Sequence, residues 1–242
     1  MTHPQPGKRL AIVFLHGAGG RGQIWQNQLL DFPIAIAPDL PGHPEGRPFD
    51  RVEDYAAWLR AFLDRGGMHG VVLVGHSMGG AVALRAALDA PDSLRGLVLV
   101  STGAHLPVDP DVLDGLHRAP LRTIDRVVET WFVPGADARQ RERVRTAIRE
   151  LGPDTLLRDL SACARFDVRD RVHEIRLPTL ILCGDADIVT PPALSSFLHE
   201  RMTRSDLIVV PGAGHMLPLQ RRVAFRDALR RFLAALAAEG AG

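Results

Sequence analysis

Short apolar runs recur along the chain and alternate with longer stretches whose apolar residues are spaced as on one face of a helix. The runs are rich in Val, Ile and Leu, with Gly, Pro or Asp close behind them. Buried parallel strands have this pattern, because crossover helices cover both faces of the sheet that they form. The alternation predicts an α/β fold with a mainly parallel sheet flanked by helices. The expected strands are Leu10 to Leu15, Ile34 to Ala37, Val71 to Val74, Leu97 to Val100, Thr179 to Cys183 and Leu207 to Val210.

The alternation is interrupted from about Gly103 to Arg171, where helical patterns continue without a buried strand. This segment is expected to be a helical insertion, with residues 1–103 and 171–242 forming the core and residues 104–170 forming a cap. Pro and Gly separate its helices. The expected cap helices are Pro110 to His117, Leu121 to Trp131, Asp137 to Leu151 and Asp154 to Ala164, and the expected core helices are Asp54 to Asp64, Met78 to Ala90 and Arg221 to Ala237.

Charge and composition exclude several classes of protein. The 242 residues are 46% hydrophobic and carry a formal net charge of +1, so the chain can bury a large core but has no strong field to attract nucleic acid. The segment Met1 to Lys8 lacks a secretory signal, and no apolar stretch is long enough to span a bilayer, so a cytoplasmic protein without membrane association is expected. Cys163 and Cys183 are too few for a disulfide framework or a structural zinc site, and no metal or cofactor is expected.

The motif Gly75-His76-Ser77-Met78-Gly79 matches the G-x-S-x-G pattern of serine hydrolases. It directly follows the apolar run ending at Val74 and opens an expected helix, so it predicts a sharp turn from strand to helix. Such a turn exposes the serine hydroxyl, and the flanking glycines leave room where strand and helix meet. Ser77 is therefore the expected nucleophile. A helix cap that binds nothing or holds a phosphate is the alternative, but no P-loop lysine or acidic ribose-binding residue accompanies it.

A serine hydroxyl needs a histidine to accept its proton and an acid to orient that histidine. Among ten histidines, His215 has the best position, in a glycine-rich loop between the expected strand ending at Val210 and the last helix. Two acids, Asp185 and Asp187, follow the strand that ends at Cys183, and only one can orient His215. Asp187 is favoured because it lies where the loop turns back over the sheet edge, whereas Asp185 is expected to cap its own turn.

The remaining histidines are expected to have other roles. His16 ends the first strand and is expected to make a buried structural hydrogen bond. His76 adjoins Ser77 and is expected to point elsewhere, while His43 is expected in a loop or on a helix surface.

The segment His16-Gly17-Ala18-Gly19-Gly20 follows the first expected strand and supplies backbone N–H groups without bulky side chains. Ester hydrolysis develops negative charge on the carbonyl oxygen, and two fixed N–H donors stabilise that charge. The expected donors of this oxyanion hole are the N–H groups of Ala18 and Met78.

Together these motifs resemble the α/β-hydrolase superfamily over nearly the whole chain, including the order nucleophile, acid, base. Within it the chain looks most like small carboxylesterases of the kind that includes pimeloyl-ACP methyl ester esterase and 3-oxoadipate enol-lactonase. The resemblance implies a metal-independent carboxylesterase acting on small-molecule esters, with the insertion as a cap over the site. Pimeloyl-ester enzymes usually have tryptophan where this chain has Ala18. The matching segments are His16 to Gly19, Asp39 to His43, Gly75 to Gly80, Gly184 to Asp187 with Pro191, and Gly212 to His215.

The cap offers three aromatic candidates for the substrate pocket, Trp131, Phe132 and Phe166, although packing alone would explain each of them. The run Arg139 to Arg145 would suit docking of an acidic acyl carrier protein, but acidic residues interleave with the arginines, so a solvated helix face is favoured. Lactone opening, thioester cleavage, perhydrolysis and carbon–carbon bond cleavage are alternative reactions for the same triad. A ligand-binding protein that has lost catalysis is the contrasting class.

Overall fold

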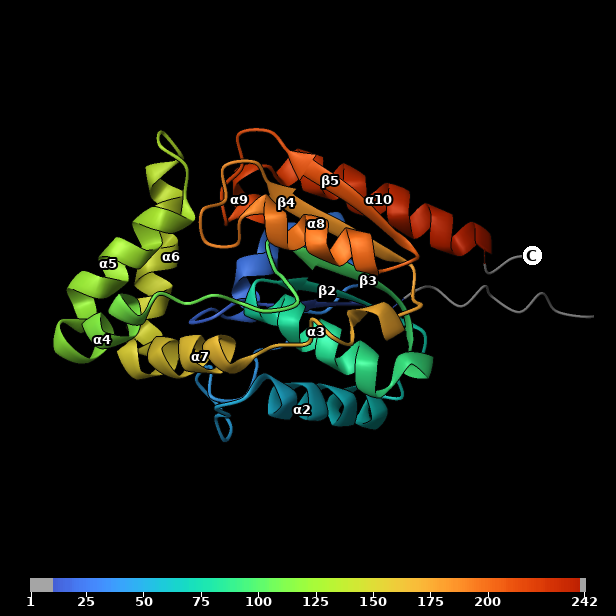
Figure 1. The fold of residues 1–242 in the computed structure, drawn as a ribbon, viewed down its shortest axis with the longest axis horizontal. Coiled ribbons are helices and arrows are strands. Elements are labelled where there is room, and N and C mark those ends of the chain that lie inside the picture. Colours follow the sequence, from blue (N-terminus) through green and yellow to red (C-terminus); the bar gives the residue numbers. More distant parts are fainter. Residues whose placement is uncertain (1–10, 240–242) are drawn as a thin grey trace, which may run out of the picture.

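The computed structural model describes residues 11–239, in which five parallel strands form one sheet (Figure 1). The strands lie in the sheet in the same order as in the sequence, so each new strand joins the same edge. This is the predicted α/β class. Leu10, the expected first residue of the first strand, lies outside the described residues. The strands are β1 (Ile12–Leu15), β2 (Val71–His76), β3 (Leu94–Val100), β4 (Thr179–Gly184) and β5 (Ser205–Val210).

Helices cover both faces of the sheet. Strands added in one direction by right-handed crossovers place their connecting helices on one face, and α2 (Val52–Arg65), α3 (Met78–Asp89) and α8 (Pro192–Arg201) lie there. The other face is covered by α1 (Gln26–Asp31), which follows the short helix η1 (Gly22–Trp25), and by α10 (Arg222–Glu239). The sequence did not predict α1 or α8. Within residues 11–239 no helix is long and apolar enough to cross a membrane.

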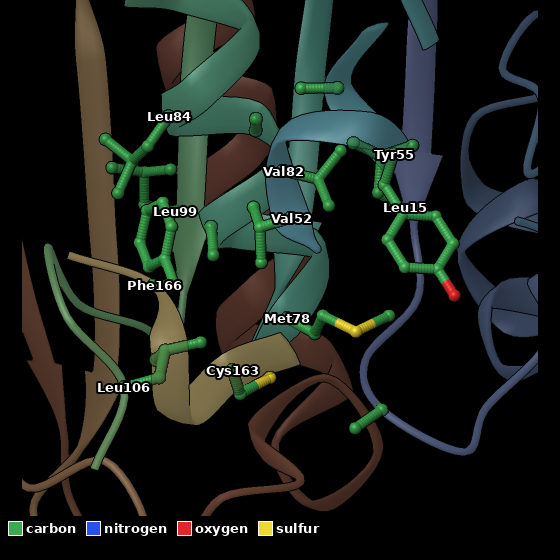
Figure 2. Packing of buried hydrophobic residues seen from close by; sticks show 14 of the residues in the cluster. Leu15, Val52, Tyr55, Met78, Val82, Leu84, Leu99, Leu106, Cys163 and Phe166 are labelled. Atoms are coloured by element: carbon green, nitrogen blue, oxygen red, sulfur yellow. The ribbon is translucent and has the colours of Figure 1, made fainter. Parts of the chain in front are cut away.

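Alternate side chains of each strand pack into two separate cores, as the period of two in a strand requires. Leu73 of β2 belongs to the core beneath α2 and α3. Figure 2 shows part of this core, with Leu15 and Leu99 from the neighbouring strands. Its neighbours Val72 and Val74 face the opposite core with α10. Because both faces are covered, the strands have the continuous apolar runs seen in the sequence.

The expected strand over Ile34 to Ala37 is wrong. Only Ile36 pairs with β1, in a single parallel bridge to Val13. The next donor of that ladder would be the N–H of residue 38, which is a proline and has none. The segment therefore cannot extend its pairing.

Four helices follow β3 and stand to one side of the sheet (Figure 1). Each begins and ends within one residue of the sequence prediction. Proline occupies the first position of three of them, where the missing N–H would have had no helical acceptor. The remaining helix has no such proline. Asp137, its expected first residue, is instead its N-cap, and the Asp137 carboxylate accepts from Arg139 N–H at 2.8 Å. These helices are α4 (Pro110–Arg118), α5 (Pro120–Trp131), α6 (Ala138–Leu151) and α7 (Pro153–Arg165).

Candidate active site

Ser77 lies in a tight turn between β2 and α3, with φ 53° and ψ −119°. This left-handed conformation is unfavourable for a residue with a side chain and persists only where the surroundings hold it. Ser77 N–H donates to Val100 O (3.0 Å), and Ser77 O accepts from the Thr102 hydroxyl (2.8 Å). A Cβ on Gly75 would lie 2.3 Å from Gly79 O, so the close approach of strand and helix requires glycine. The structure thus contains the predicted strand-turn-helix.

Asp187 and His215 form a buried pair at the carboxyl ends of β4 and β5. Asp187 Oδ2 lies 3.0 Å from His215 Nδ1, and both side chains are almost completely excluded from solvent. Oδ1 of the same carboxylate accepts the backbone N–H groups of Val189 and Thr190, each at 2.9 Å. The Thr190 hydroxyl donates to Oδ2 at 2.8 Å. Every lone-pair direction of the carboxylate is therefore used, which fixes its orientation.

The Asp187 carboxyl is held in its ionised form. Burial by itself would raise its pKa, but the His215 imidazole and the hydrogen bonds from His215 and Thr190 outweigh burial and lower the pKa to about 2. An ionised carboxylate only accepts hydrogen bonds, so His215 Nδ1 carries a proton. In neutral His215 the second ring nitrogen, Nε2, is then free to accept one.

Two contacts of this pair were not predicted from the sequence. Thr190 touches both Asp187 and His215, and its place three residues after Asp187 in one turn was the only available signal. His76 Nε2 donates to the backbone carbonyl of His215 at 2.9 Å, which ties the His215 loop to β2. Burial, with a smaller effect of His215, lowers the pKa of His76 to about 3, so His76 is neutral at physiological pH.

Asp185, the competing acid, does not contact His215. It is exposed, and its carboxylate accepts the N–H of Gly212 at 2.7 Å. The expectation that it caps its own turn is wrong, since it braces the neighbouring loop that leads to His215.

The segment between β1 and η1 packs directly against the turn at Ser77. A Cβ on Gly17 would lie 3.1 Å from Ser77 Cβ. In this segment Gly19 N–H donates to Asp159, and Gly20 N–H donates to Gly17 O. Neither Ala18 N–H nor Met78 N–H has a hydrogen-bond acceptor within residues 11–239, so these two donors are available to a bound molecule.

The histidines near this segment have structural contacts. His16 is buried, as expected, and its Nε2 accepts Leu40 N–H at 3.0 Å. Burial and the neighbouring His43 lower the pKa of His16 to about 4. His43 was expected in a loop or on a surface, and the surface prediction is wrong because its side chain is fully buried 2.7 Å from Asp159. No sequence pattern links His43 to a residue so far along the chain.

A cavity of about 750 Å³ joins these features. Ser77, His215, Ala18 and Trp131 line it, together with one face of α6 and residues of η1 and α1. The Trp131 ring lies 5.9 Å from the His215 ring, centroid to centroid.

Phe132 and Phe166, the other two aromatic candidates, do not line the cavity. Phe166 follows α7 and packs beside Leu106 and Cys163 in the core (Figure 2). Phe132 directly follows α5 and lies beneath the guanidinium group of Arg141. Both side chains are buried by packing, which is the alternative that the sequence left open.

The profile described as the alpha/beta hydrolase family matches residues 12–228. The chain belongs to the α/β-hydrolase family. A pimeloyl-[acyl-carrier protein] methyl ester esterase of Neisseria meningitidis is 29% identical, over 96% of this chain and 79% of that protein. A thermophilic esterase of known structure is 33% identical, with a TM-score of 0.85 over 95% of this chain and 92% of that one.

An enol-lactonase from Burkholderia xenovorans shares the fold at 21% identity, with a TM-score of 0.83 over 94% of this chain and 92% of that one. These comparisons identify the protein as a hydrolase of the esterase type. Within the described part of the chain, no group of three or more His, Cys, Asp or Glu side chains is placed to hold a metal ion.

Proposed function

We propose that the protein is a serine carboxylesterase that hydrolyses small to medium carboxylic esters through an acyl-enzyme on Ser77. The observation that carries this proposal is that Ser77 and His215 line one cavity, while buried Asp187 orients His215 from behind. A buried acid, a histidine and a serine on a strained turn are the parts that nucleophilic acyl transfer requires.

In the acylation step, Ser77 Oγ attacks the ester carbonyl and His215 Nε2 accepts the hydroxyl proton. Asp187 keeps the other ring proton on Nδ1 and stabilises the imidazolium that forms. The carbonyl oxygen becomes an oxyanion, which the N–H groups of Ala18 and Met78 stabilise. Collapse of this intermediate breaks the ester C–O bond, and His215 returns the proton to the departing alcohol.

In the deacylation step, His215 accepts a proton from water, and the resulting oxygen nucleophile attacks the acyl carbonyl. The same two N–H groups stabilise the second oxyanion. When the bond to Ser77 Oγ breaks, His215 returns the proton to the serine, and the carboxylic acid leaves.

The size and lining of the cavity support a free small ester as the substrate. A volume of about 750 Å³ lies in the range of pockets for small molecules. Trp131 of α5 and Ile148 of α6 form part of its wall, which supports our proposal that residues 104–170 act as a cap. Met216 and Leu219 add apolar surface near His215.

Docking of an acyl carrier protein on the arginine run has less support. Arg141 pairs with Glu129 at 3.1 Å, and Arg145 pairs with Asp125 at 3.2 Å and with Glu129 at 2.6 Å. These ion pairs join α6 to α5 inside the cap, so the two arginine charges are compensated within the protein. The Neisseria relative nevertheless makes a carrier-bound methyl ester a necessary comparison substrate.

The proposal is tested with a fluorophosphonate probe and a panel of substrates. We expect a covalent adduct on Ser77 in the wild-type protein and none in Ser77→Ala. p-Nitrophenyl esters of increasing acyl length are compared with a lactone, a thioester, a vinylogous diketone and a carrier-bound methyl ester. Absence of a Ser77 adduct in folded protein would refute the serine mechanism. Turnover of the diketone with every ester inert would refute the substrate class.

A further inference from the structure

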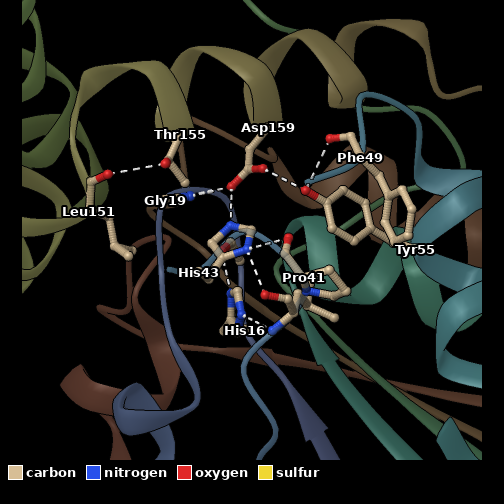
Figure 3. Close-up of polar contacts among 11 residues, drawn as sticks. His16, Gly19, Pro41, His43, Phe49, Tyr55, Leu151, Thr155 and Asp159 are labelled. Atoms are coloured by element: carbon tan, nitrogen blue, oxygen red, sulfur yellow. Dashed lines mark hydrogen bonds and ion pairs between the residues drawn. The ribbon is translucent and has the colours of Figure 1, made fainter. Parts of the chain in front are cut away.

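A buried polar cluster joins the cap to the loop that carries Ala18 (Figure 3). At its centre is Asp159 of α7, whose side chain is completely buried. Its Oδ2 accepts Gly19 N–H at 2.8 Å and lies 2.7 Å from His43 Nε2. Its Oδ1 lies 3.2 Å from the Tyr55 hydroxyl, which points at the cluster from α2. One cap carboxylate therefore contacts three separate segments of the core.

The hydrogen bonds of His43 fix this carboxylate. His43 Nδ1 lies 3.0 Å from Leu40 O and 3.2 Å from Pro41 O, and because carbonyl oxygens only accept, Nδ1 carries a proton. Burial by itself lowers the pKa of His43, but the hydrogen bond and charge of Asp159 reverse this and raise it. His43 and Asp159 are thus joined by a short buried hydrogen bond of 2.7 Å, which holds Oδ2 in one place.

The position of Gly19 depends on this carboxylate. Residues 17–20 form a turn closed by the bond from Gly20 N–H to Gly17 O at 3.1 Å. Such a bond leaves the N–H of the third turn residue, Gly19, without a partner inside the turn. Asp159 supplies the acceptor. A Cβ on Gly19, which has φ 61°, would lie 2.9 Å from Leu156 Cδ1, so α7 also packs directly on the turn.

The same turn sets the direction of Ala18 N–H. This N–H belongs to the peptide plane that also contains Gly17 O, and the two groups point in opposite directions in a trans peptide. Gly20 holds the Gly17 end of the turn, and Asp159 holds the peptide plane that follows Ala18. Both planes that flank the Ala18 Cα atom are therefore restrained.

We propose that Asp159 is a positioning residue: through Gly19 N–H it holds the 17–20 turn so that Ala18 N–H points at the oxyanion. The oxyanion hole is then complete only when α7 is seated on the core. This inference rests on the proposed function, because it takes Ala18 N–H to be an oxyanion donor. A simple structural link between cap and core would instead affect stability and leave kcat unchanged.

The test compares Asp159→Leu, which is close in size and has no acceptor, with wild-type protein. Removing an oxyanion-hole donor outright costs about 10²–10³ in kcat, so a donor that is only misdirected is expected to cost about tenfold or more. We expect KM for p-nitrophenyl acetate to change by less than about threefold, because the hole acts mainly on the transition state. The inhibition constant of a trifluoromethyl ketone, which forms a charged adduct with serine, is expected to rise in parallel with the loss of kcat.

Thr155→Val is the matched control. Thr155 lies one turn earlier on α7, is similarly buried, and donates its hydroxyl proton only to Leu151 O at 3.1 Å. We expect it to lower stability without changing kcat or the inhibition constant. If Asp159→Leu does not fold, Asp159→Asn replaces it. Its amide oxygen can take the place of Oδ2, but as a neutral acceptor it binds Gly19 N–H and His43 less strongly than a carboxylate oxygen does, and we expect an intermediate loss of kcat, about threefold or more.

The outcomes separate the two proposals. A wild-type protein with neither esterase activity nor a Ser77 adduct would overturn the proposed function and this inference with it. An active wild type whose folded Asp159 variants keep wild-type kcat and inhibition constant would overturn this inference alone. The same holds if Thr155→Val loses kcat to the same extent as Asp159→Leu.

Discussion

Replacing Asp187 with asparagine is expected to remove nearly all esterase activity, because the local hydrogen bonds dictate how the new amide is oriented. Val189 N–H and Thr190 N–H both donate to Oδ1 of the present carboxylate. In Asp187→Asn the amide oxygen must occupy that position, since the opposite orientation would leave two N–H groups facing an NH₂ group. Each hydrogen bond is worth about 1 kcal/mol, so the preference is about 2 kcal/mol.

With the amide oxygen fixed there, the NH₂ group faces His215 Nδ1. That nitrogen must then accept, so the ring proton moves to Nε2, the atom that has to take the proton of Ser77. The wrong tautomer of the base lowers kcat by about 10⁴, or about 5 kcal/mol in the activation free energy. Substrate binding is expected to be preserved, because Asp187 does not line the cavity.

The assay is the initial rate of p-nitrophenyl acetate hydrolysis at pH 7.5 (about one unit above the ordinary pKa of histidine), together with the rate of fluorophosphonate labelling. Asp185→Asn is the control, because Asp185 lies two residues away, is exposed, and contacts Gly212 rather than His215. We expect it to keep kcat within about twofold, as surface substitutions usually do. A folded Asp187→Asn variant with kcat within about tenfold of the wild type would refute the tautomer argument.

Three further effects are expected. Thr190→Val removes the hydroxyl that donates to Asp187 at 2.8 Å, and should lower kcat several-fold and the free energy of unfolding in urea by about 1–2 kcal/mol. Gly79→Ala places a Cβ 2.4 Å from Leu15 O, and should cost about 1–3 kcal/mol in the same measurement and lower kcat by shifting the Ser77 turn. The pKa of Asp187 is lowered from 3.8 to about 2, so its stabilising contribution is present above pH 3.8 and is lost as the pH falls through about 2. Denaturation at stepped pH should show this loss in the wild type and not in Asp187→Asn.

The contrast between Ser77 and His43 indicates how much of the site the sequence could predict. The Ser77 turn was predictable because its requirements are local: an apolar strand before it, glycines two residues away on each side, and a helix after it. His43 was misplaced because its burial depends on Asp159, which lies 116 residues further along the chain. No sequence pattern around His43 or Asp159 predicts that the two side chains are in contact.

Strand prediction failed for a related reason at Ile34 to Ala37. The run is apolar, but whether it pairs depends on the ladder donors that it offers to β1, and Pro38 removes the next one. The three aromatic candidates are all buried and differ in what their rings face. Trp131 lines the cavity while Phe132 and Phe166 pack elsewhere, and the direction in which each ring points was decided by how α5 and α7 sit on their neighbours.

The sequence by itself determined the α/β class, the four helices after β3, the strand-turn-helix at Ser77 and the order of Ser77, Asp187 and His215 along the chain. Each of these follows from residues that are close together in the chain. Only the tertiary structure decided which groups brace them, namely Thr190 on the acid, His76 on the His215 loop, and Asp159 on the turn beside Ala18. A hydrogen bond or a buried ion pair depends on distances of about 3 Å between atoms, and for segments far apart in sequence those distances exist only once the sheet and its helices have packed.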